Sequence, residues 1–234
     1  ERGELTLAVF AISDLHLPAR QKPMDIFGPH WERHFERISQ DWRARVSEED
    51  IVLLPGDLTW AMHLEEALED LNQVGALPGR KLILRGNLDY WWSAIGRVRR
   101  ALPEGMYAIQ NDVLEMDGML FAGSRGWTIP VGDGANPDNV RIYNRERMRL
   151  EMSLKAARRL DEAAPLIAMM HYPPRVDCAA GFSDILEKYG VCDCVYGHLH
   201  GAAINGAVRG ERNGVRYHQV SCDGLDFKLY ALQI

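Results

Sequence analysis

The stretch Lys81-Leu-Ile-Leu-Arg-Gly-Asn-Leu-Asp-Tyr-Trp-Trp92 guides the interpretation of the whole chain. Its apolar run at residues 82–84 predicts a buried strand, which ends near a Gly-Asn pair followed by a leucine, an acid and three aromatic residues. In open α/β sheets, ligands bind at the carboxyl ends of the strands, because side chains from several strands converge there. We therefore expect the polar residues after this strand to have partners elsewhere in the chain.

Four other apolar runs end in a similar way, with polar residues soon after the strand. Asp or His follows each of the runs at residues 5–12, 51–54, 166–170 and 191–196. Segments with helical patterns separate the runs, at residues 31–42, 64–74, 92–101, 143–163 and 183–189. This alternation predicts an α/β protein in which helices pack on a sheet through right-handed crossovers.

One part of the chain departs from this alternation. Turn signals, with no helix between them, separate three short apolar runs at residues 106–109, 113–116 and 119–122. We therefore expect an antiparallel portion, so that the fold is not a purely parallel sheet. The Asn213-Gly214 pair predicts a hairpin within residues 206–220, and residues 228–234 predict a closing strand.

Composition limits the protein class. A chain of 234 residues, 47% hydrophobic and 26% charged, predicts one globular domain over residues 1–234. The net charge of -6 disfavours a protein that mainly coats nucleic acid or an anionic membrane. The four cysteines form no Cys-x-x-Cys pair, which indicates a reduced, cytoplasmic setting. The charged start and the lack of a long apolar run lead us to expect no signal peptide and no membrane partner.

Carboxylate, amide and imidazole side chains follow the predicted strands. They are Asp14, His16, Asp57, Asn87, His171, His198 and His200. Mixed nitrogen and oxygen ligands without a thiolate suit Mn²⁺, Zn²⁺ or Fe better than a structural zinc site. Seven ligands are too many for one tetrahedral ion, but they suit two ions that share a bridging carboxylate and clamp a phosphoryl group.

Each of these residues alone has an ordinary explanation. A single histidine is more often a structural residue than a ligand, and Asp14 or Asp57 could each cap a helix. Packing does not require that five strand ends all carry residues of the kinds that bind metals. We therefore favour the metal site over the structural explanation.

The order of the motifs resembles that of a known family. The motifs are Asp14-Leu-His16, Gly56-Asp57, Gly86-Asn87, His171 and Gly197-His-Leu-His200. From about residue 9 to the last strand, they resemble the calcineurin-like metallophosphoesterase superfamily, and in particular a bacterial-type, single-domain member. The resemblance implies an α/β fold with four αββα layers, in which two mixed β-sheets are packed face to face and flanked by helices.

The resemblance also implies the role of each ligand. It assigns Asp14, His16 and His200 to the first metal and Asn87, His171 and His198 to the second, with Asp57 as the bridge. The implied cofactors are two divalent ions, with manganese expected first and iron, zinc, cobalt or nickel as alternatives. The implied reaction is hydrolysis of a phosphate ester by a metal-bridged hydroxide.

One motif departs from the family pattern. The family has Gly-Asn-His followed by Asp or Glu, and its histidine, oriented by the acid, is the general acid; here that position is Leu88, followed by Asp89. Leucine cannot donate a proton, so we expect reduced activity. Two explanations stay open: an introduced substitution that stops turnover, or a native residue in an enzyme that handles easy leaving groups or uses another acid.

Candidate substrate contacts are aromatic and basic residues near the strand ends. They are Arg125, Trp127, Trp91, Tyr172 and Arg145, with Arg125 and Trp127 on a long glycine-rich loop. A core role for any one tryptophan is an equally good explanation. We expect a small phosphorylated substrate or a nucleotide, and the sequence does not indicate an oligomeric state.

Two other functions stay open. A nuclease of the same superfamily is disfavoured by the acidic balance, although arginines at residues 97–100 and 141–149 could form a groove for nucleic acid. A non-enzymatic binding protein could have kept the fold, but it would have no reason to keep all seven ligands.

Overall fold

The computed structural model describes residues 7–19, 22–130, 136–175 and 181–234. The beginning of the first expected strand, Leu5 and Thr6, lies outside these residues, as do Cys178 and residues 131–135 of the glycine-rich loop. Within the described residues, eleven strands form two sheets.

The first sheet is parallel except for one edge strand. It contains, in spatial order, β11 (Tyr230–Ala231), β1 (Val9–Ala11), β2 (Ile51–Leu54), β3 (Arg80–Leu84) and β4 (Met106–Ile109). Only β11 runs antiparallel to its neighbour. The carboxyl ends of β1 to β4 therefore lie along one edge of the sheet.

The second sheet has a parallel centre between two hairpins. Its order is β5 (Val113–Met116), β6 (Met119–Ser124), β7 (Leu166–Met170), β8 (Asp193–Tyr196), β10 (Val215–Gln219) and β9 (Gly210–Arg212). The outer pairs β5·β6 and β9·β10 are antiparallel, and the pairs between β6 and β10 are parallel. The hairpin predicted at Asn213-Gly214 is confirmed.

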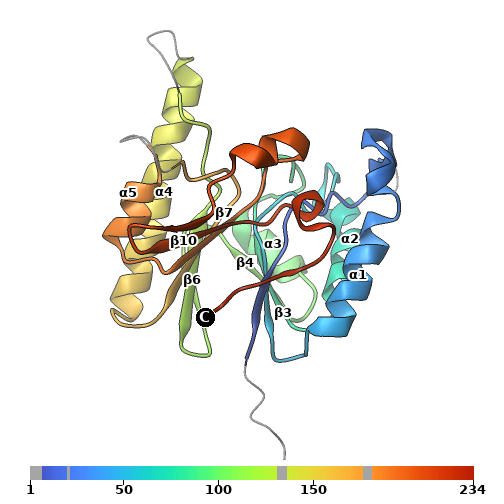
Figure 1. Ribbon diagram of the computed structural model, residues 1–234, viewed down its shortest axis with the longest axis horizontal. Helices are drawn as coiled ribbons and strands as arrows, with labels where there is room; N and C mark the ends of the chain where they lie inside the picture. The colour runs from blue at the N-terminus through green and yellow to red at the C-terminus, as the bar shows by residue number, and fades with distance from the viewer. Residues whose placement is uncertain (1–6, 20–21, 131–135, 176–180) are drawn as a thin grey trace, which may run out of the picture.

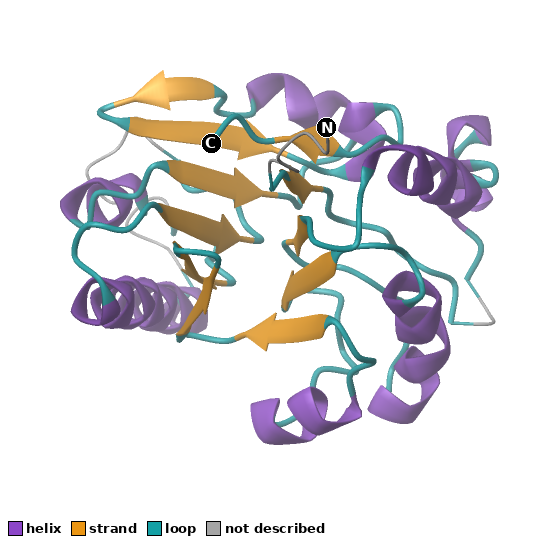
Figure 2. Cartoon of the chain, turned by 90° about the horizontal axis from the view of Figure 1, so that it is seen from below, coloured by secondary structure: helices purple, strands orange, loops and turns teal. Residues whose placement is uncertain are grey.

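Helices cover the outer face of each sheet, as Figures 1 and 2 show. The first sheet carries α1 (His34–Arg45), α2 (Leu64–Gly75) and α3 (Ile95–Ala101), and the second carries α4 (Pro137–Leu160) and α5 (Ser183–Lys188). Four short 3₁₀ helices lie in the connections: η1 (Met24–Phe27), η2 (Pro29–Trp31), η3 (Gly201–Gly206) and η4 (Cys222–Leu225). The expected four-layer αββα sandwich of two mixed sheets is confirmed.

Alternate residues of the strands point into different layers of the core. Val52 and Leu54 of β2 pack against the helices, whereas Ile51 and Leu53 pack between the sheets with residues of β6 and β7. All four are fully buried. Strands covered on both faces are apolar throughout, which explains why these strands are continuous apolar runs in the sequence.

Two sequence predictions needed correction. Residues 106–109 do not join an antiparallel group with the two runs after them, because β4 pairs in parallel with β3 in the first sheet while β5 and β6 form a hairpin in the second. The chain changes sheets between Ile109 and Val113. The closing strand is shorter than expected, with only Tyr230 and Ala231 paired to β1.

The long helix α4 begins earlier than the expected residue 143. Asn136 caps it by accepting a hydrogen bond from the backbone N–H of Asp138 at 2.8 Å, and Pro137 occupies the first turn. Among the described residues, the structure holds no helix with the length and apolar character that crossing a membrane requires.

Candidate metal centre

The ends of β3, β7 and β8 bring three of the predicted ligands into contact. Asn87 Oδ1 lies 2.7 Å from Nε2 of His171 and 2.8 Å from Nδ1 of His198. The same Nε2 atom of His171 lies 3.5 Å from Asp57 Oδ2. These four side chains therefore surround one small volume.

The remaining ligands lie beside this group. His200 Nε2 is 3.4 Å from His16 Nε2 and 3.4 Å from Asp14 Oδ1. Among the described residues, two sets of side chains have ligand atoms within 4.8 Å of one another: Asp14, His16 and His200, and Asp14, Asp57 and His171. The structure thus brings all seven predicted residues together, with Asp14 common to both sets. Their division between two ions, with Asp57 as the bridge, stays a prediction.

Several ligands have an unusual backbone conformation. Asp14, His16, Asp57 and His198 have φ values of 58°, 44°, 53° and 71°, in the left-handed region that costs free energy for residues other than glycine. Backbone hydrogen bonds hold these turns: the N–H of Asp14 donates to the carbonyl of Gly56 at 3.0 Å, and that of His16 to Asp57 at 3.1 Å. Such turns let the side chains leave the strand ends toward a common centre.

Neighbouring groups orient two of the histidines. His171 Nδ1 lies 3.0 Å from the carbonyl oxygen of Pro55, and His200 Nδ1 lies 3.0 Å from Asp223 Oδ1. A proton on each Nδ1 satisfies these oxygens and leaves Nε2 free to bind a metal, an arrangement common among metal-ligating histidines. Sequence analysis missed Asp223, although it follows the end of strand β10 as the other polar residues follow theirs.

Asp14 is held by hydrogen bonds and has no contact with solvent. It is 0% exposed, and its Oδ2 accepts hydrogen bonds from Ser221 Oγ at 2.9 Å and from the backbone N–H of His198 at 3.0 Å. Burial opposes its ionisation, but the hydrogen bond with His200 and the nearby histidines outweigh burial and hold the pKa of Asp14 below its ordinary value. This carboxylate is charged and fixed in place.

The pKa values of the other two buried carboxyls, Asp57 and Asp89, are raised, in each case mainly by burial. Burial, together with repulsion from Asp89 and Asp14, raises the pKa of Asp57 to about 9. Carboxylates crowded in a dry site need nearby positive charge to ionise together. The donor set therefore fits divalent cations, which would supply that charge.

The histidines divide into two kinds. Burial lowers the pKa of His16 to about 3 and that of His198 to about 4, and it also lowers the pKa of His171. Burial also opposes the charge on His200, but hydrogen bonds to Asp14 and Asp223 raise its pKa to about 10. Neutral imidazoles are the form that binds a metal, so three of the four are ready to do so.

Asp89 is surrounded by hydrogen-bond donors from other residues, whereas in the family pattern the acid at this position orients the histidine before it. Its Oδ1 accepts hydrogen bonds from Leu58 N and Trp91 Nε1, each at 2.9 Å, and its Oδ2 accepts from Asp57 N at 2.9 Å and Gly86 N at 2.7 Å. Four donors fill the acceptor positions of a carboxylate. Asp89 is fully buried and joins the turns after β2 and β3, so it positions Asp57 rather than orienting a side chain at position 88.

The predicted substrate residues are separated in the structure. Trp91 is only 1% exposed, packs in the core beneath α3 and supports Asp89, so it cannot contact a substrate and we no longer assign it that role. The rings of Tyr172 and His198 lie in contact, with centroids 4.2 Å apart and planes tilted by 40°, and the centroid of the Trp127 ring lies 5.1 Å from that of Tyr172. The Arg125 guanidinium lies 4.8 Å from the centre of the Trp127 ring. These three residues extend from the metal centre along the second sheet, in the direction of Arg145 on α4.

An open pocket of about 420 Å³ gives access to the metal ligands. Its walls include Asp57, Asn87, His198 and His200, and its other side is largely apolar, with Met24, Phe27, Trp31, Trp60 and Leu88. Leu88 therefore lies at the site itself, where its backbone N–H donates to Asp57 Oδ1 at 2.8 Å. An apolar group of a bound molecule could rest against this wall.

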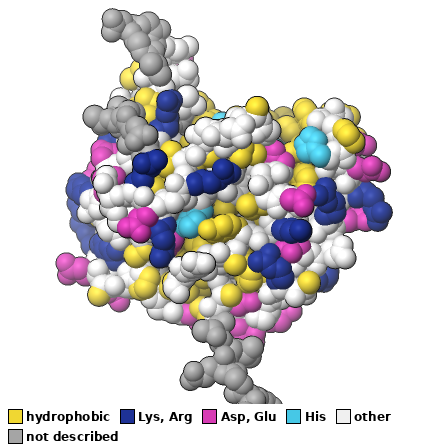
Figure 3. Space-filling view, in the orientation of Figure 1, with side chains coloured by type: hydrophobic (Ala, Val, Ile, Leu, Met, Phe, Trp, Pro, Cys, Tyr) yellow, Lys and Arg dark blue, Asp and Glu magenta, His cyan; other side chains and the backbone are white. Residues whose placement is uncertain are grey.

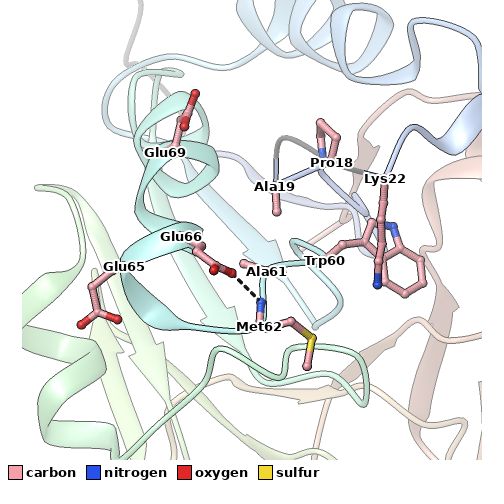
Figure 4. A pocket seen from close by; sticks show the side chains of 9 residues that line it. All are labelled: Pro18, Ala19, Lys22, Trp60, Ala61, Met62, Glu65, Glu66 and Glu69. Atoms are coloured by element: carbon pink, nitrogen blue, oxygen red, sulfur yellow. Dashed lines mark hydrogen bonds between the residues drawn. The ribbon is translucent and has the colours of Figure 1, made fainter.

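A neighbouring pocket, shown in Figure 4, shares Trp60 but has a different charge. Glu65, Glu66 and Glu69 line it with Lys22, and Glu66 Oε2 accepts a hydrogen bond from the backbone N–H of Met62 at 3.2 Å. Glu65 also pairs with Arg97, but Lys22 is the single basic residue of the described lining, so carboxylates still predominate there, which disfavours an anionic substrate. Of the two pockets, the one over the candidate metal ligands therefore suits an anion better.

Comparison with known proteins agrees with this geometry. The chain is similar to a protein of unknown function from Aquifex aeolicus, with 18% identity, a TM-score of 0.51 and coverage of 97% of this chain and 96% of that one. It is also similar to the phosphopantetheinyl hydrolase of Mycobacterium tuberculosis, with 17% identity, a TM-score of 0.53 and coverage of 92% and 88%. No curated protein matches the chain. A family model for calcineurin-like phosphoesterases matches residues 7–202, so the chain belongs to the calcineurin-like phosphoesterase family.

Proposed function

We propose that this protein is a phosphoester hydrolase that requires two divalent metal ions at the site of Asp14, His16, Asp57, Asn87, His171, His198 and His200. The observation that carries the proposal is the convergence of these nitrogen and oxygen groups in one place, with Asp14, Asp57 and His171 buried among them. When bound, the ions would supply positive charge to the phosphoryl oxygens and lower the pKa of a water molecule.

The chain itself prepares the site before substrate arrives. The Pro55 carbonyl and Asp223 fix the imidazoles of His171 and His200, and Asp89 fixes the turn that carries Asp57. Preorganised groups of this kind stabilise a transition state without rearrangement during the reaction. The apolar wall around Leu88 excludes water from one side of the site.

The position of Leu88 points to a class of ester. Leucine offers no proton to a leaving oxygen, so we propose that the chain favours esters whose leaving groups depart without protonation, and that it is slow on alkyl esters. The apolar wall supports this choice, because an aryl or other apolar leaving group would bury surface against Phe27 and Trp60.

The proposal also includes the identity of the metal ion and the cellular location of the protein. We propose manganese as the preferred ion, with iron, zinc, cobalt or nickel as alternatives, because carboxylate, amide and imidazole ligands suit all of these. A cytoplasmic location is supported by Cys192, Cys194 and Cys222, which are free thiols in the described structure.

The nuclease alternative has less support. Arg97, Arg99 and Arg147 each pair with an acid, so their charges are already balanced. On the face shown in Figure 3, basic side chains are interspersed with acidic ones and form no continuous band. A phosphodiester backbone needs such a band for strong binding.

The test is a panel of aryl and alkyl phosphomonoesters, phosphodiesters and nucleotides assayed with Mn²⁺. We expect hydrolysis that metal removal abolishes and that Asn87→Ala reduces strongly, while His63→Ala, a change at an exposed histidine away from the site, has no effect. Strongly salt-dependent binding of single-stranded nucleic acid would favour the nuclease. Failure to bind metal would favour a non-enzymatic binding protein.

A further inference from the structure

A separate polar pocket of about 250 Å³ lies on the same edge of the sandwich as the metal centre. Leu84, Ile109 and Ser124, the last residues of β3, β4 and β6, line it, together with residues of α4. The metal ligands follow β1, β2 and β3 in one sheet and β7 and β8 in the other. The pocket is therefore the next position along both sheets, one to two strand spacings, or about 5 to 10 Å, from the metal centre.

Positive charge is in excess in this pocket. Among the described residues that line it, four are arginines, Arg85, Arg125, Arg145 and Arg149, and a single one, Glu146, is acidic. Glu146 is 1% exposed, and its Oε1 pairs with Arg149 at 2.6 Å but lies 3.8 Å from Arg145 and 3.9 Å from Arg125. Within the part of the chain that the structure describes, Glu146 therefore pairs closely with Arg149 alone, and Arg125 and Arg145 have no carboxylate as close as that.

Two of these arginines are partly desolvated. Arg125 has an 18% exposed side chain, and Nε of Arg85 is buried without a hydrogen-bond partner among the described residues. Burial and the neighbouring Arg85 and Arg145 lower the pKa of Arg125, against the opposing effect of Glu146. A buried N–H without an acceptor costs free energy that an incoming oxygen would recover.

Backbone connections join this pocket to the metal centre. The carbonyl oxygen of Arg125 accepts hydrogen bonds from the backbone N–H groups of His171 at 3.1 Å and Tyr172 at 2.9 Å. Arg85 lies two residues before the ligand Asn87. The backbones of Arg85 and Arg125 are thus connected directly to the segments that carry the candidate metal ligands.

We propose that the arginine pocket, lined by Arg85, Arg125, Arg145 and Arg149, binds a second phosphate group of the substrate while the metal centre holds the phosphoester to be cleaved. This rests on the proposed function and specifies its substrate class: a small molecule with two phosphate groups about 5 to 10 Å apart. Several guanidinium groups offer more donors and more charge than one carboxylate can accept, which favours a phosphate dianion over a carboxylate.

The direct test measures anion binding without metal and without turnover. Metal-free protein is titrated with inorganic pyrophosphate by calorimetry, with succinate as the carboxylate probe. Arg145→Gln and Arg125→Gln should each weaken pyrophosphate binding by about 10-fold, because each removes a charge-assisted contact. Arg43→Gln, at an exposed arginine of α1 that does not line the pocket, should not change it. Arg145 has a half-exposed side chain, so its loss should leave the fold intact.

The possible outcomes separate this proposal from the proposed function. Equal pyrophosphate affinity in the wild type, Arg145→Gln and Arg125→Gln, or no binding at all, would overturn the arginine pocket. Succinate binding as tight as pyrophosphate binding would overturn the choice of phosphate. With Mn²⁺ present, the kcat/KM ratio of a bisphosphate to its monophosphate should fall in Arg145→Gln. Pyrophosphate binding that depends on Arg125 and Arg145, without hydrolysis of any ester, would support the arginine pocket. It would contradict only the proposed function.

Discussion

Replacing Gly197 by alanine tests whether the metal ligands depend on close backbone packing. Gly197 follows β8 and precedes His198, and a Cβ there would overlap Asp14 Oδ2 and Ser13 Oγ and lie 2.9 Å from Ser13 Cβ. Ser13 cannot move away easily, because its N–H donates to the Val220 carbonyl at 2.8 Å. The added methyl group must therefore displace Asp14.

The size of the effect follows from the bonds that Asp14 would lose. Overpacking a tight site costs about 1 to 3 kcal/mol of folding free energy. Displacing the carboxylate also weakens its hydrogen bonds from His198 N, at 3.0 and 3.2 Å, and from Ser221 Oγ. Loss of groups that orient a metal ligand typically costs about 10- to 100-fold in metal affinity. We expect a reduction of that size for Gly197→Ala.

Calorimetric titration with Mn²⁺ and unfolding by urea measure the two effects. The matched control is Gly206→Ala, at a position where a Cβ meets nothing within 4 Å among the described residues. It should bind Mn²⁺ as the wild type does. If Gly197→Ala bound Mn²⁺ with wild-type affinity and stoichiometry, the placement of Asp14 beside Gly197 would be refuted.

Three further predictions concern neighbouring residues. Asp89→Asn should lose about two of four buried hydrogen bonds and reduce the free energy of unfolding by about 2 to 4 kcal/mol, and an unchanged urea midpoint would contradict the positioning role. Leu88→His should raise turnover of an alkyl phosphoester by about 10²- to 10⁴-fold and that of an activated aryl ester much less, whereas small and equal effects would argue against a missing general acid. Metal binding should release protons near pH 7, because the pKa values of about 10 for His200 and about 9 for Asp57 leave both protonated in the metal-free protein. The metal affinity should therefore rise with pH up to about 10. Calorimetry in buffers of different ionisation enthalpy measures that release, and heats that do not depend on the buffer would contradict it.

The alternation of strands and helices could be predicted because it has a local cause. A strand buried on both faces, such as Ile51–Leu54, must be apolar at every position, and an amphipathic helix must repeat its apolar residues every three or four positions. Strand pairing has no such local signal. Only residues 110–112 separate β4 from β5, yet the two strands join different sheets, because pairing depends on contacts with segments far away in the sequence.

The candidate site was predictable in its ligand types but not in its supports. Aspartate and histidine after apolar runs are visible in the sequence, whereas the partnership of Asp223 with His200 exists only once η4 folds beside the strand ends. The structural roles of Asp89 and Trp91 could not be predicted from the sequence either. Whether a side chain faces the pocket or the core depends on the turn that carries it, and nothing in the Asp-Tyr-Trp-Trp sequence distinguishes the buried Trp91 from the exposed Tyr90.

The central claim is that two divalent ions at this site support phosphoester hydrolysis. It is tested most directly by measuring hydrolysis of an activated aryl phosphoester while metal-free protein is titrated with Mn²⁺. We predict no activity without metal and a rise that saturates as the second equivalent of Mn²⁺ binds. Full activity in the metal-free protein, or saturation after a single equivalent, would contradict the account.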